Sequence, residues 1–234
     1  MKLVIIAGPP SSGKTAVVKQ IIAQKRAETE IAYLKIDVTR VFEDQEIAEE
    51  FGIPTRKVCS GDLCPDHAGV MVMKDALIWA EEEKADLLII ESAGLCLRCS
   101  PYTTQALAVV VLSAVSGVHT PLKMAPMIAL SDVAVVTRID LVSQAEKEVF
   151  RESIREVTTE PEIIETNALQ GTGMRYLLRR INELPEITDR DTIVLRGVPP
   201  LGVCTICIGK KEIGWQKHFG VIRKLEGDYL YRGD

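Results

Sequence analysis

The stretch GPPSSGKT, at residues 8–15, decides the fold of this chain. It matches the pattern G-x-x-x-x-G-K-[S/T], in which glycines let successive backbone N–H groups face a phosphate. A short apolar run, KLVIIA at residues 2–7, precedes it, and a helical pattern begins near Lys14. The N-terminus of such a helix adds a dipole that favours anions. The order of strand, glycine loop and helix therefore predicts a P-loop nucleoside triphosphatase.

Segments with strand-like and helix-like patterns alternate along the rest of the chain. Short apolar runs predict strands at residues 2–7, 31–37, 86–91, 107–113, 133–137 and 163–166. Helical patterns predict helices at residues 14–27, 44–51, 70–83, 145–157 and 174–182. Because such alternation implies βαβ crossovers, we expect an α/β fold in which helices flank a mainly parallel sheet. Ligands then bind at the carboxyl ends of the strands.

Length and composition predict the domain organisation. The chain has 234 residues, which suits one α/β domain with a modest appendage. Prolines and glycines become frequent from about residue 184, and they interrupt regular helix. We therefore expect a P-loop GTPase domain at residues 1–187 and a small β-rich, cysteine-containing appendage at residues 188–234.

Charge and hydropathy exclude several classes of partner. The net charge is −5 and aromatic residues make up 5% of the chain, which argues against a nucleic-acid partner. The N-terminal apolar run is too short for a signal peptide, and residues 106–115 are too few for a membrane span. We therefore expect a cytoplasmic protein with no membrane partner. In that compartment the six cysteines are expected to be metal ligands or redox groups.

Polar residues follow several of the expected strands. Asp37 ends the second strand, within LKIDVT, where a carboxylate can reach magnesium or its waters. The third strand ends in ESAG, residues 91–94, whose glycine N–H can meet a γ-phosphate and so form a switch. TRID, at residues 137–140, follows a later strand, and its aspartate can accept two hydrogen bonds from a guanine edge. TNALQGTG, at residues 166–173, lies between a strand and a helix.

Taken in this order, the motifs resemble those of the GTPases that deliver nickel during hydrogenase and urease maturation, the HypB, UreG and CobW-like proteins of the SIMIBI class. ESAG resembles the Glu-x-x-Gly switch of that family. Residues 119–142 resemble the segment that leads into the guanine-recognition motif. Residues 34–70 resemble the segment that runs from the magnesium Asp to a metal-binding Cys. The resemblance covers roughly residues 1–183.

The resemblance implies a nucleotide site with GTP and Mg²⁺ as cofactors. Its expected members are Gly8, Pro9, Pro10, Ser11, Ser12, Gly13, Lys14, Thr15, Ala16, Gly94, Thr137, Arg138, Asp140, Asn167, Ala168 and Leu169. Lys14 is expected to bridge the β- and γ-phosphates, and Thr15 and Asp37 are expected to hold magnesium. Lys14 is also the expected catalytic cation for water attack on the γ-phosphate. Asp37 and Glu91 are the candidates for positioning that water.

Two motifs depart from the family pattern. Where the family has Asn-Lys-x-Asp, this chain has Thr-Arg-Ile-Asp. Asp140 remains and Arg138 can stack on the base as Lys does, but Thr137 cannot reproduce the contacts of an Asn amide. Where the family has Cys-His or Cys-Pro-His, this chain has Cys-Pro-Asp-His, so that His67 is displaced by at least one position from Cys64.

Two groups of metal-ligating residues lie within the expected GTPase domain. Thiolate and imidazole are ligands for nickel, zinc and copper, and thiolates also hold iron–sulfur clusters. Cys64 and His67 have C-x-x-H spacing, and Cys64 matches the metal Cys of the family. Cys96 and Cys99 form a C-x-x-C pair directly after the switch. Movement of the switch on hydrolysis would change the geometry of a metal bound there.

A second C-x-x-C pair, Cys204 and Cys207, lies in the expected appendage. A knuckle of this kind binds structural zinc when two more ligands are present, and His218 is one candidate. The other ligands would come from a partner chain or from the first C-x-x-C pair. The alternative is an apolar pair without metal.

The leading hypothesis is a GTP-hydrolysing metallochaperone that binds nickel or zinc and delivers the metal to a client metalloenzyme. The resemblance implies a homodimer that forms through the nucleotide face when nucleotide is bound. The main alternative is a reductive activator, in which the Cys96 and Cys99 thiolates of two chains hold an iron–sulfur cluster. A small-molecule kinase is disfavoured because no arginine-rich lid segment is evident. A signalling switch with structural zinc only is a further alternative.

Overall fold

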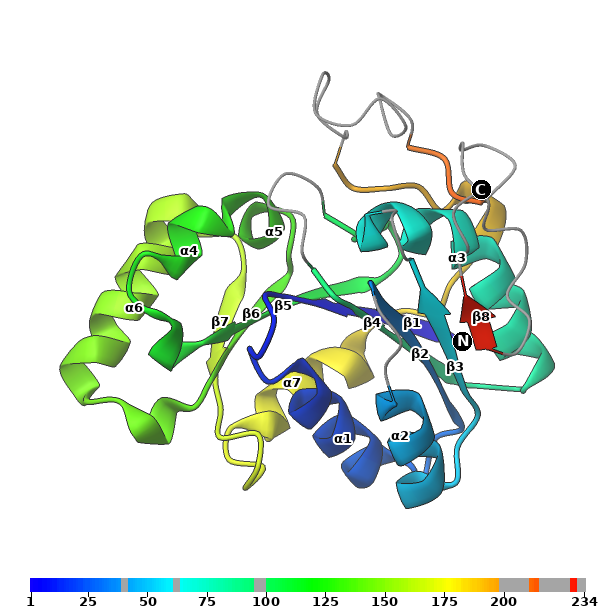
Figure 1. Ribbon diagram of the computed structural model, residues 1–234, viewed down its shortest axis with the longest axis horizontal. Helices are drawn as coiled ribbons and strands as arrows, with labels where there is room; N and C mark the ends of the chain where they lie inside the picture. Colours follow the sequence, from blue (N-terminus) through cyan, green and yellow to red (C-terminus); the bar gives the residue numbers. More distant parts are fainter. Residues whose placement is uncertain (39–41, 61–63, 95–99, 198–210, 215–227, 231–234) are drawn as a thin grey trace.

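The protein is a three-layered α/β domain in which helices cover both faces of a parallel sheet (Figure 1). The computed structural model describes residues 1–38, 42–60, 64–94, 100–197, 211–214 and 228–230. The strands are β1 (Lys2–Ala7), β2 (Ile31–Asp37), β3 (Thr55–Cys59), β4 (Leu87–Ser92), β5 (Leu107–Ser113), β6 (Val133–Thr137), β7 (Glu162–Glu165) and β8 (Asp228–Leu230). The helices are α1 (Lys14–Lys25), α2 (Glu43–Phe51), α3 (Pro65–Glu82), α4 (Thr120–Lys123), α5 (Ala125–Ala129), α6 (Gln144–Val157) and α7 (Met174–Glu183). Short 3₁₀ turns span Ala114–Ser116, Ile139–Leu141 and Arg190–Thr192.

The sheet has the order β7-β6-β5-β1-β4-β2-β3-β8, and each neighbouring pair is parallel. β1 lies in the middle, between β4 and β5. Parallel neighbours need crossover connections, which the helices supply. Because all strands point the same way, their carboxyl ends form one edge of the sheet. The loop that follows β1 therefore lies at the centre of that edge, where ligands bind in such folds.

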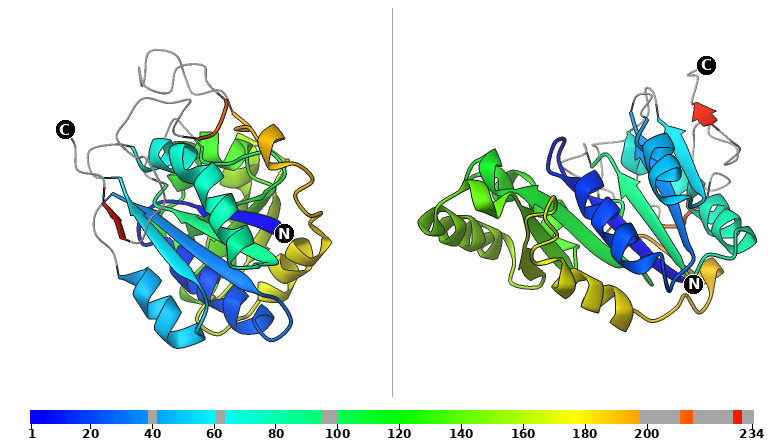
Figure 2. Two further views of the ribbon diagram at one scale, coloured as in Figure 1. Left: turned by 90° about the vertical axis from the view of Figure 1, so that its right-hand side faces the viewer. Right: turned by 90° about the horizontal axis from the view of Figure 1, so that it is seen from below.

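Alternation along the strands builds two apolar cores. In β1, Leu3 and Ile5 face one core, whereas Val4 and Ile6 face the other. The first core packs against α3, α5 and α6, and the second against α1, α2 and α7. α1 and α7 lie side by side beneath the sheet (Figures 1 and 2). Burial on both faces explains why the central strands are continuously apolar. No helix in the described ranges is long and apolar enough to cross a membrane.

Several elements differ from the expectation, and among them the short helices α4 and α5 were not expected. Helix α3 begins at Pro65 rather than at residue 70, because proline suits the first turn of a helix, where its missing N–H is not needed. Cys64 is therefore the N-cap of α3. Strand β3, TRKVC, was not expected, since Arg56 and Lys57 break the apolar pattern. The buried ammonium of Lys57 is neutralised by Asp44 at 3.4 Å, which allows it to lie within the sheet.

The described parts of the C-terminal segment lie against the main domain. Ile193, Leu195 and Ile213 belong to the first core. The backbone of β8 pairs in parallel with β3 and extends the main sheet. Arg196 donates to both carboxylate oxygens of Asp132, each at 2.7 Å. The division at residues 187 and 188 remains a prediction.

Candidate nucleotide site

The loop between β1 and α1 requires glycine at two places, and the ESAG segment after β4 requires it at a third. Gly8 has φ 155°, and a Cβ there would lie 2.2 Å from the carbonyl oxygen of Val111. Gly13 has φ 93° and is the N-cap of α1. Gly94, at the end of the ESAG segment, has φ 59°, and its Cβ would lie 2.6 Å from both the N and the O of Gly8. The ESAG segment therefore rests directly on the backbone of the phosphate loop.

Lys14, the first residue of α1, has its ammonium inside this loop. Its Nζ donates to the carbonyl oxygens of Gly8 at 2.9 Å and Pro9 at 3.0 Å. Burial lowers the pKa of Lys14 from 10.5 to about 8, against the opposing effect of Glu91. Burial therefore makes the charged ammonium less favourable, and an anionic phosphate beside it would raise this pKa again.

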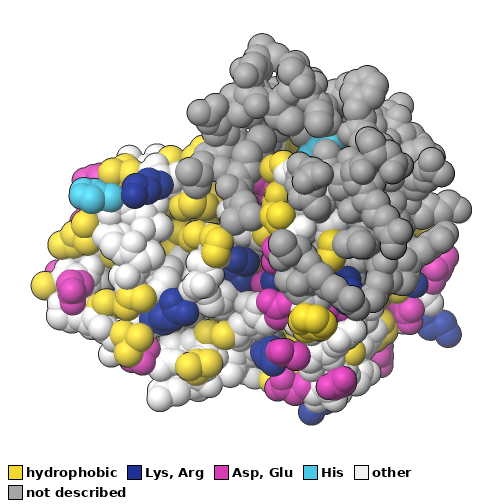
Figure 3. Space-filling view, viewed as in Figure 1, with side chains coloured by type: hydrophobic (Ala, Val, Ile, Leu, Met, Phe, Trp, Pro, Cys, Tyr) yellow, Lys and Arg dark blue, Asp and Glu magenta, His cyan; other side chains and the backbone are white. Residues whose placement is uncertain are grey.

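Most of the predicted phosphate-loop residues, though not Gly8, Pro9 or Ser12, line one hollow of about 420 Å³ at the carboxyl edge of the sheet. Its walls are Pro10, Ser11, Gly13, Lys14, Thr15, Ala16, Lys35, Asp37, Glu43, Glu91, Ala93 and Arg138. In the space-filling view, basic and acidic side chains meet near the middle of the molecule (Figure 3). The structure thus brings together four predicted site residues: Lys14, Thr15, Asp37 and Glu91.

The carboxylate of Glu91 is fully buried and has three donors. Its Oε1 accepts from Lys35 Nζ at 2.6 Å and from Thr15 Oγ1 at 3.0 Å, and its Oε2 accepts from Tyr33 at 2.8 Å. Asp37 is partly exposed, and one of its carboxylate oxygens lies 3.8 Å from the Lys35 ammonium. Hydroxyl and carboxylate oxygens are the ligands that Mg²⁺ prefers, so Thr15 and Asp37 fit this ion.

The segments expected to read the base follow β6 and β7. Thr137, which ends β6, donates to the carbonyl oxygen of Ser12 at 2.6 Å and so ties this strand to the phosphate loop. Arg138 lies in the left-handed region with φ 57° and donates to Ser113 Oγ at 3.1 Å. Asp140 belongs to the 3₁₀ turn that follows.

The loop after β7 is held by its own side chains. The carboxamide oxygen of Asn167 accepts from the N–H groups of Leu169 at 3.1 Å and Gln170 at 3.2 Å. Ala168 is buried, whereas the Leu169 side chain is 86% exposed. Asn167 thus shapes the loop that carries Ala168, whose contact with the base remains a prediction.

The candidate transition-metal residues are placed only in part. Cys64 and His67 both lie in the first turn of α3, where Cys64 is partly exposed and His67 is 2% exposed. Within the described residues there is no cluster of three or more His, Cys, Asp or Glu side chains suited to a metal. The other four predicted ligands lie outside the described residues: Cys96, Cys99, Cys204 and Cys207.

Sequence reasoning missed Tyr33 and Lys35 of β2. Both side chains donate to Glu91, and Lys35 also faces Glu43 at 3.9 Å. The available signal was a lone lysine, two residues before Asp37, within an otherwise apolar strand. A buried charge is costly unless it is paired, so this lysine required an acidic partner.

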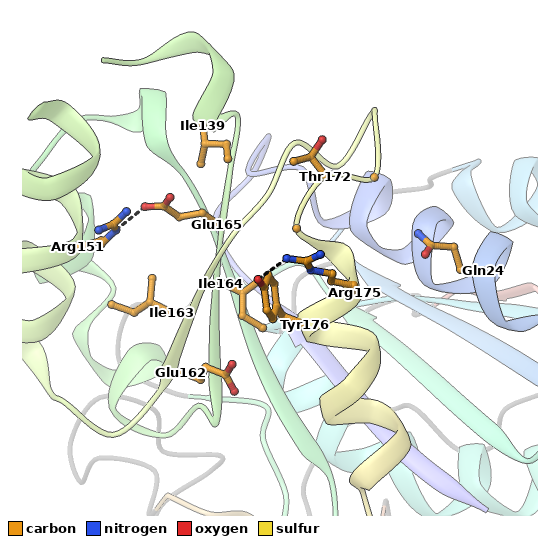
Figure 4. A pocket seen from close by; sticks show the side chains of 12 residues that line it. Gln24, Ile139, Arg151, Glu162, Ile163, Ile164, Glu165, Thr172, Arg175 and Tyr176 are labelled. Carbon is orange, nitrogen blue, oxygen red and sulfur yellow. Dashed lines mark hydrogen bonds and ion pairs between the residues drawn. The ribbon is translucent and has the colours of Figure 1, made fainter. Parts of the chain in front are cut away.

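A second hollow, of about 750 Å³, lies on the outer side of β7 (Figure 4). Arg151 of α6 points to Glu165 on one side, and Arg175 of α7 donates to the Tyr176 hydroxyl on the other. None of the predicted site residues lines this hollow. The phosphate pocket is therefore the candidate site, although it is the smaller of the two, because predicted phosphate-binding and magnesium-binding residues line it.

Strand β1, the glycine loop and α1, together with the carboxylates at the strand ends, define a P-loop nucleotide-binding protein. The family model described as "CobW/HypB/UreG, nucleotide-binding domain" matches residues 2–165. The chain therefore belongs to the CobW/HypB/UreG family of P-loop GTP-binding proteins, whose members are generally GTPases.

One relative matches along the whole chain. The uncharacterized protein MJ0120 of Methanocaldococcus jannaschii is 37% identical over 236 residues and is covered fully, as is this chain. Among solved structures, the hydrogenase maturation factor HypB of Archaeoglobus fulgidus has a TM-score of 0.61 at 21% identity, with 78% of this chain and 89% of that chain covered. HypB of Helicobacter pylori, solved in complex with nickel, has a TM-score of 0.61 at 19% identity, with 81% and 91% covered. These structures show the same fold.

Proposed function

We propose that this protein hydrolyses GTP and uses the cycle to bind a metal ion, nickel first among the candidates, and deliver it to a client metalloenzyme. One contact supports the coupling most directly. Ser92, in the ESAG segment, donates from its hydroxyl to Asp66 at 3.2 Å, and both side chains are buried. Asp66 lies in the same first turn of α3 as Cys64 and His67. A shift of the ESAG segment would therefore reach the candidate metal ligands through one hydrogen bond.

In hydrolysis, Lys14 holds the phosphates and stabilises the charge that develops during water attack. Magnesium, when bound through Thr15 and Asp37, supplies charge neutralisation. Glu91 is an unsuitable base for the attacking water, because three donors already occupy its carboxylate. Asp37 is the better candidate for orienting water, since its carboxylate is partly exposed to the pocket.

Guanine selection is assigned to Asp140, with Arg138 placed beside the phosphate pocket. The test compares GTP, xanthosine triphosphate and ATP as ligands of the wild type and of Asp140→Asn. The amide of the variant should prefer xanthine to guanine. An amide can donate a hydrogen bond where the carboxylate only accepts, and xanthine has an acceptor where guanine has a donor. A preference for ATP in the wild type, or unchanged GTP affinity in the variant, would contradict guanine recognition by Asp140.

Cys64 and His67 offer two metal ligands in each chain. Two protomers that meet across the nucleotide face offer twice as many, which suits a four-coordinate ion such as zinc or a nickel ion. We therefore propose a nucleotide-dependent homodimer. Cys96, Cys99, Cys204 and Cys207 are proposed as further ligands. A cytoplasmic location accords with ligands of this kind, because thiolates persist in a reducing compartment.

The alternative is a nucleotide-driven activator with an iron–sulfur cluster between protomers. Its support is the C-x-x-C pair directly after the ESAG segment. Anaerobic purification separates the two functions. A brown protein that contains iron and labile sulfide favours the activator, whereas a colourless protein that takes up nickel or zinc favours the metallochaperone.

A further inference from the structure

Glu91, Thr15 and two β2 side chains form a buried network behind the phosphate pocket. Lys35 of β2 is the register partner of Glu91 of β4, so the two side chains leave neighbouring strands on the same face. Tyr33, two residues earlier on β2, points to that face as well. All three lie beneath α1, whose second residue is Thr15.

The network fixes the orientation of the Thr15 hydroxyl hydrogen. A threonine hydroxyl has one proton to donate and lone pairs with which to accept. Thr15 Oγ1 donates its proton to Glu91 Oε1 at 3.0 Å, which leaves its lone pairs for a cation. This arrangement needs a Glu91 carboxylate that does not rotate.

Lys35 and Tyr33 hold this carboxylate in place. Lys35 Nζ lies 2.6 Å from the same Oε1, and the Tyr33 hydroxyl lies 2.8 Å from Oε2, so each carboxylate oxygen is held. The Lys35 ammonium also lies 3.9 Å from Glu43 and 3.8 Å from Asp37, so acidic side chains surround it. Burial, and then the charge of Glu91, raises the pKa of Tyr33, so its hydroxyl remains a donor.

We propose that Lys35 and Tyr33 are positioning residues for the magnesium-bound nucleotide: they hold Glu91 so that Thr15 presents a lone pair to the cation. This inference rests on the proposed function, because it assumes that the pocket binds a nucleotide with Mg²⁺. Tyr33 does not line the phosphate pocket, whereas Lys35 is part of its wall. Both act through Glu91 and then Thr15.

The test measures the affinity of a fluorescent GDP analogue as Mg²⁺ is titrated, in the wild type, Tyr33→Phe and Lys35→Met. Each variant should need about tenfold more Mg²⁺ for the same gain in nucleotide affinity. This is the lower end of the effects seen when a residue that hydrogen-bonds to a metal ligand is replaced. In EDTA the affinity of Tyr33→Phe should stay unchanged, because Tyr33 does not line the pocket. Lys35→Met also removes a positive charge from the pocket wall and should bind the analogue more weakly even in EDTA, so only its dependence on Mg²⁺ is compared. Electron paramagnetic resonance of Mn²⁺ in the protein–GDP complex gives a second readout that does not involve hydrolysis.

Lys57→Met is the matched control, because Lys57 is also a buried lysine, paired with Asp44 at 3.4 Å outside the phosphate pocket. It should lower thermal stability yet leave the Mg²⁺ titration as in the wild type. If Tyr33→Phe and Lys35→Met only lower stability and their Mg²⁺ curves superimpose on that of the wild type, the positioning role is wrong. Should Lys35→Met not fold, Tyr33→Phe decides. A wild type that binds no guanine nucleotide would instead overturn the proposed function.

Discussion

Gly94 lies against Gly8 so closely that a Cβ added to Gly94 would stand 2.6 Å from both the nitrogen and the oxygen of Gly8. The end of the ESAG segment and the start of the phosphate loop therefore share one backbone contact. No side chain fits between them. Any displacement of Gly94 is transmitted to the loop that is expected to hold the phosphates.

Gly94→Ala should weaken GTP binding by about tenfold or more, since even 1.4 kcal/mol of distortion in the loop has that effect. The control is Gly52→Ala. Gly52 also has a positive φ, 69°, but a Cβ there meets nothing within 4 Å. Both variants carry the backbone strain of about 1–2 kcal/mol, and only Gly94→Ala also disturbs the loop. Equal GTP affinity in the two variants would show that the contact is unimportant.

The lowered pKa of Lys14 predicts pH-dependent nucleotide binding. The pKa of Lys14 is about 8 in the folded protein, compared with the ordinary value of 10.5. Below pH 8 the buried ammonium is charged, and its full cost in folding stability is present. As the pH rises from 8 to 10.5 the folded protein loses this proton first, so the cost disappears. A bound phosphate should raise the pKa again. GTP affinity should therefore fall by up to about tenfold per pH unit above pH 8, with proton uptake on binding.

Calorimetry in buffers of different ionisation enthalpy measures this proton uptake. Nucleotide binding at pH 8.5 should be accompanied by proton uptake at Lys14. At pH 6.5 Lys14 is already protonated and should take up almost no protons, so this pH serves as the internal control. Identical, buffer-independent enthalpies at both pH values would show that Lys14 does not change its protonation.

Thr137 should stabilise the phosphate loop through its hydroxyl. Thr137→Val keeps the branched shape but removes the donor to Ser12, and leaves a buried carbonyl unpaired. The free energy of unfolding in urea should fall by about 1–3 kcal/mol. Thr137→Ser keeps the donor and should lose less. If the serine variant were the less stable of the two, packing rather than the hydrogen bond would be the main contribution of this residue.

The central strands and the phosphate loop were predictable because their signals are local. KLVIIA and LAVVVLS are continuously apolar, as strands buried on both faces must be. The glycine pattern at residues 8–15 needs only its flanking strand and helix for recognition. Strand β3 was missed because its lysine is neutralised by Asp44, a residue of another element.

The Glu91 network could not be predicted for a related reason. It depends on the register of β2 against β4, which places Lys35 opposite Glu91, and that pairing joins residues far apart in the chain. The sequence offered Glu91 as a candidate for positioning water. In the structure its carboxylate accepts from three side chains, one of which is the expected magnesium ligand Thr15, and its role in positioning water remains a prediction. Cys64 and His67 were predicted as a pair, and the early start of α3 places both in one helical turn.

Metal content as a function of bound nucleotide tests the central claim most directly. The untagged protein is purified anaerobically and dialysed against nickel or zinc, with and without a non-hydrolysable GTP analogue, and its metal is then counted. About half a metal ion per chain should bind, and only with the analogue, because two protomers would share one site of four ligands. Cys64→Ser should abolish this uptake. Metal bound equally with and without the nucleotide, or retained in Cys64→Ser, would contradict a nucleotide-gated metal carrier.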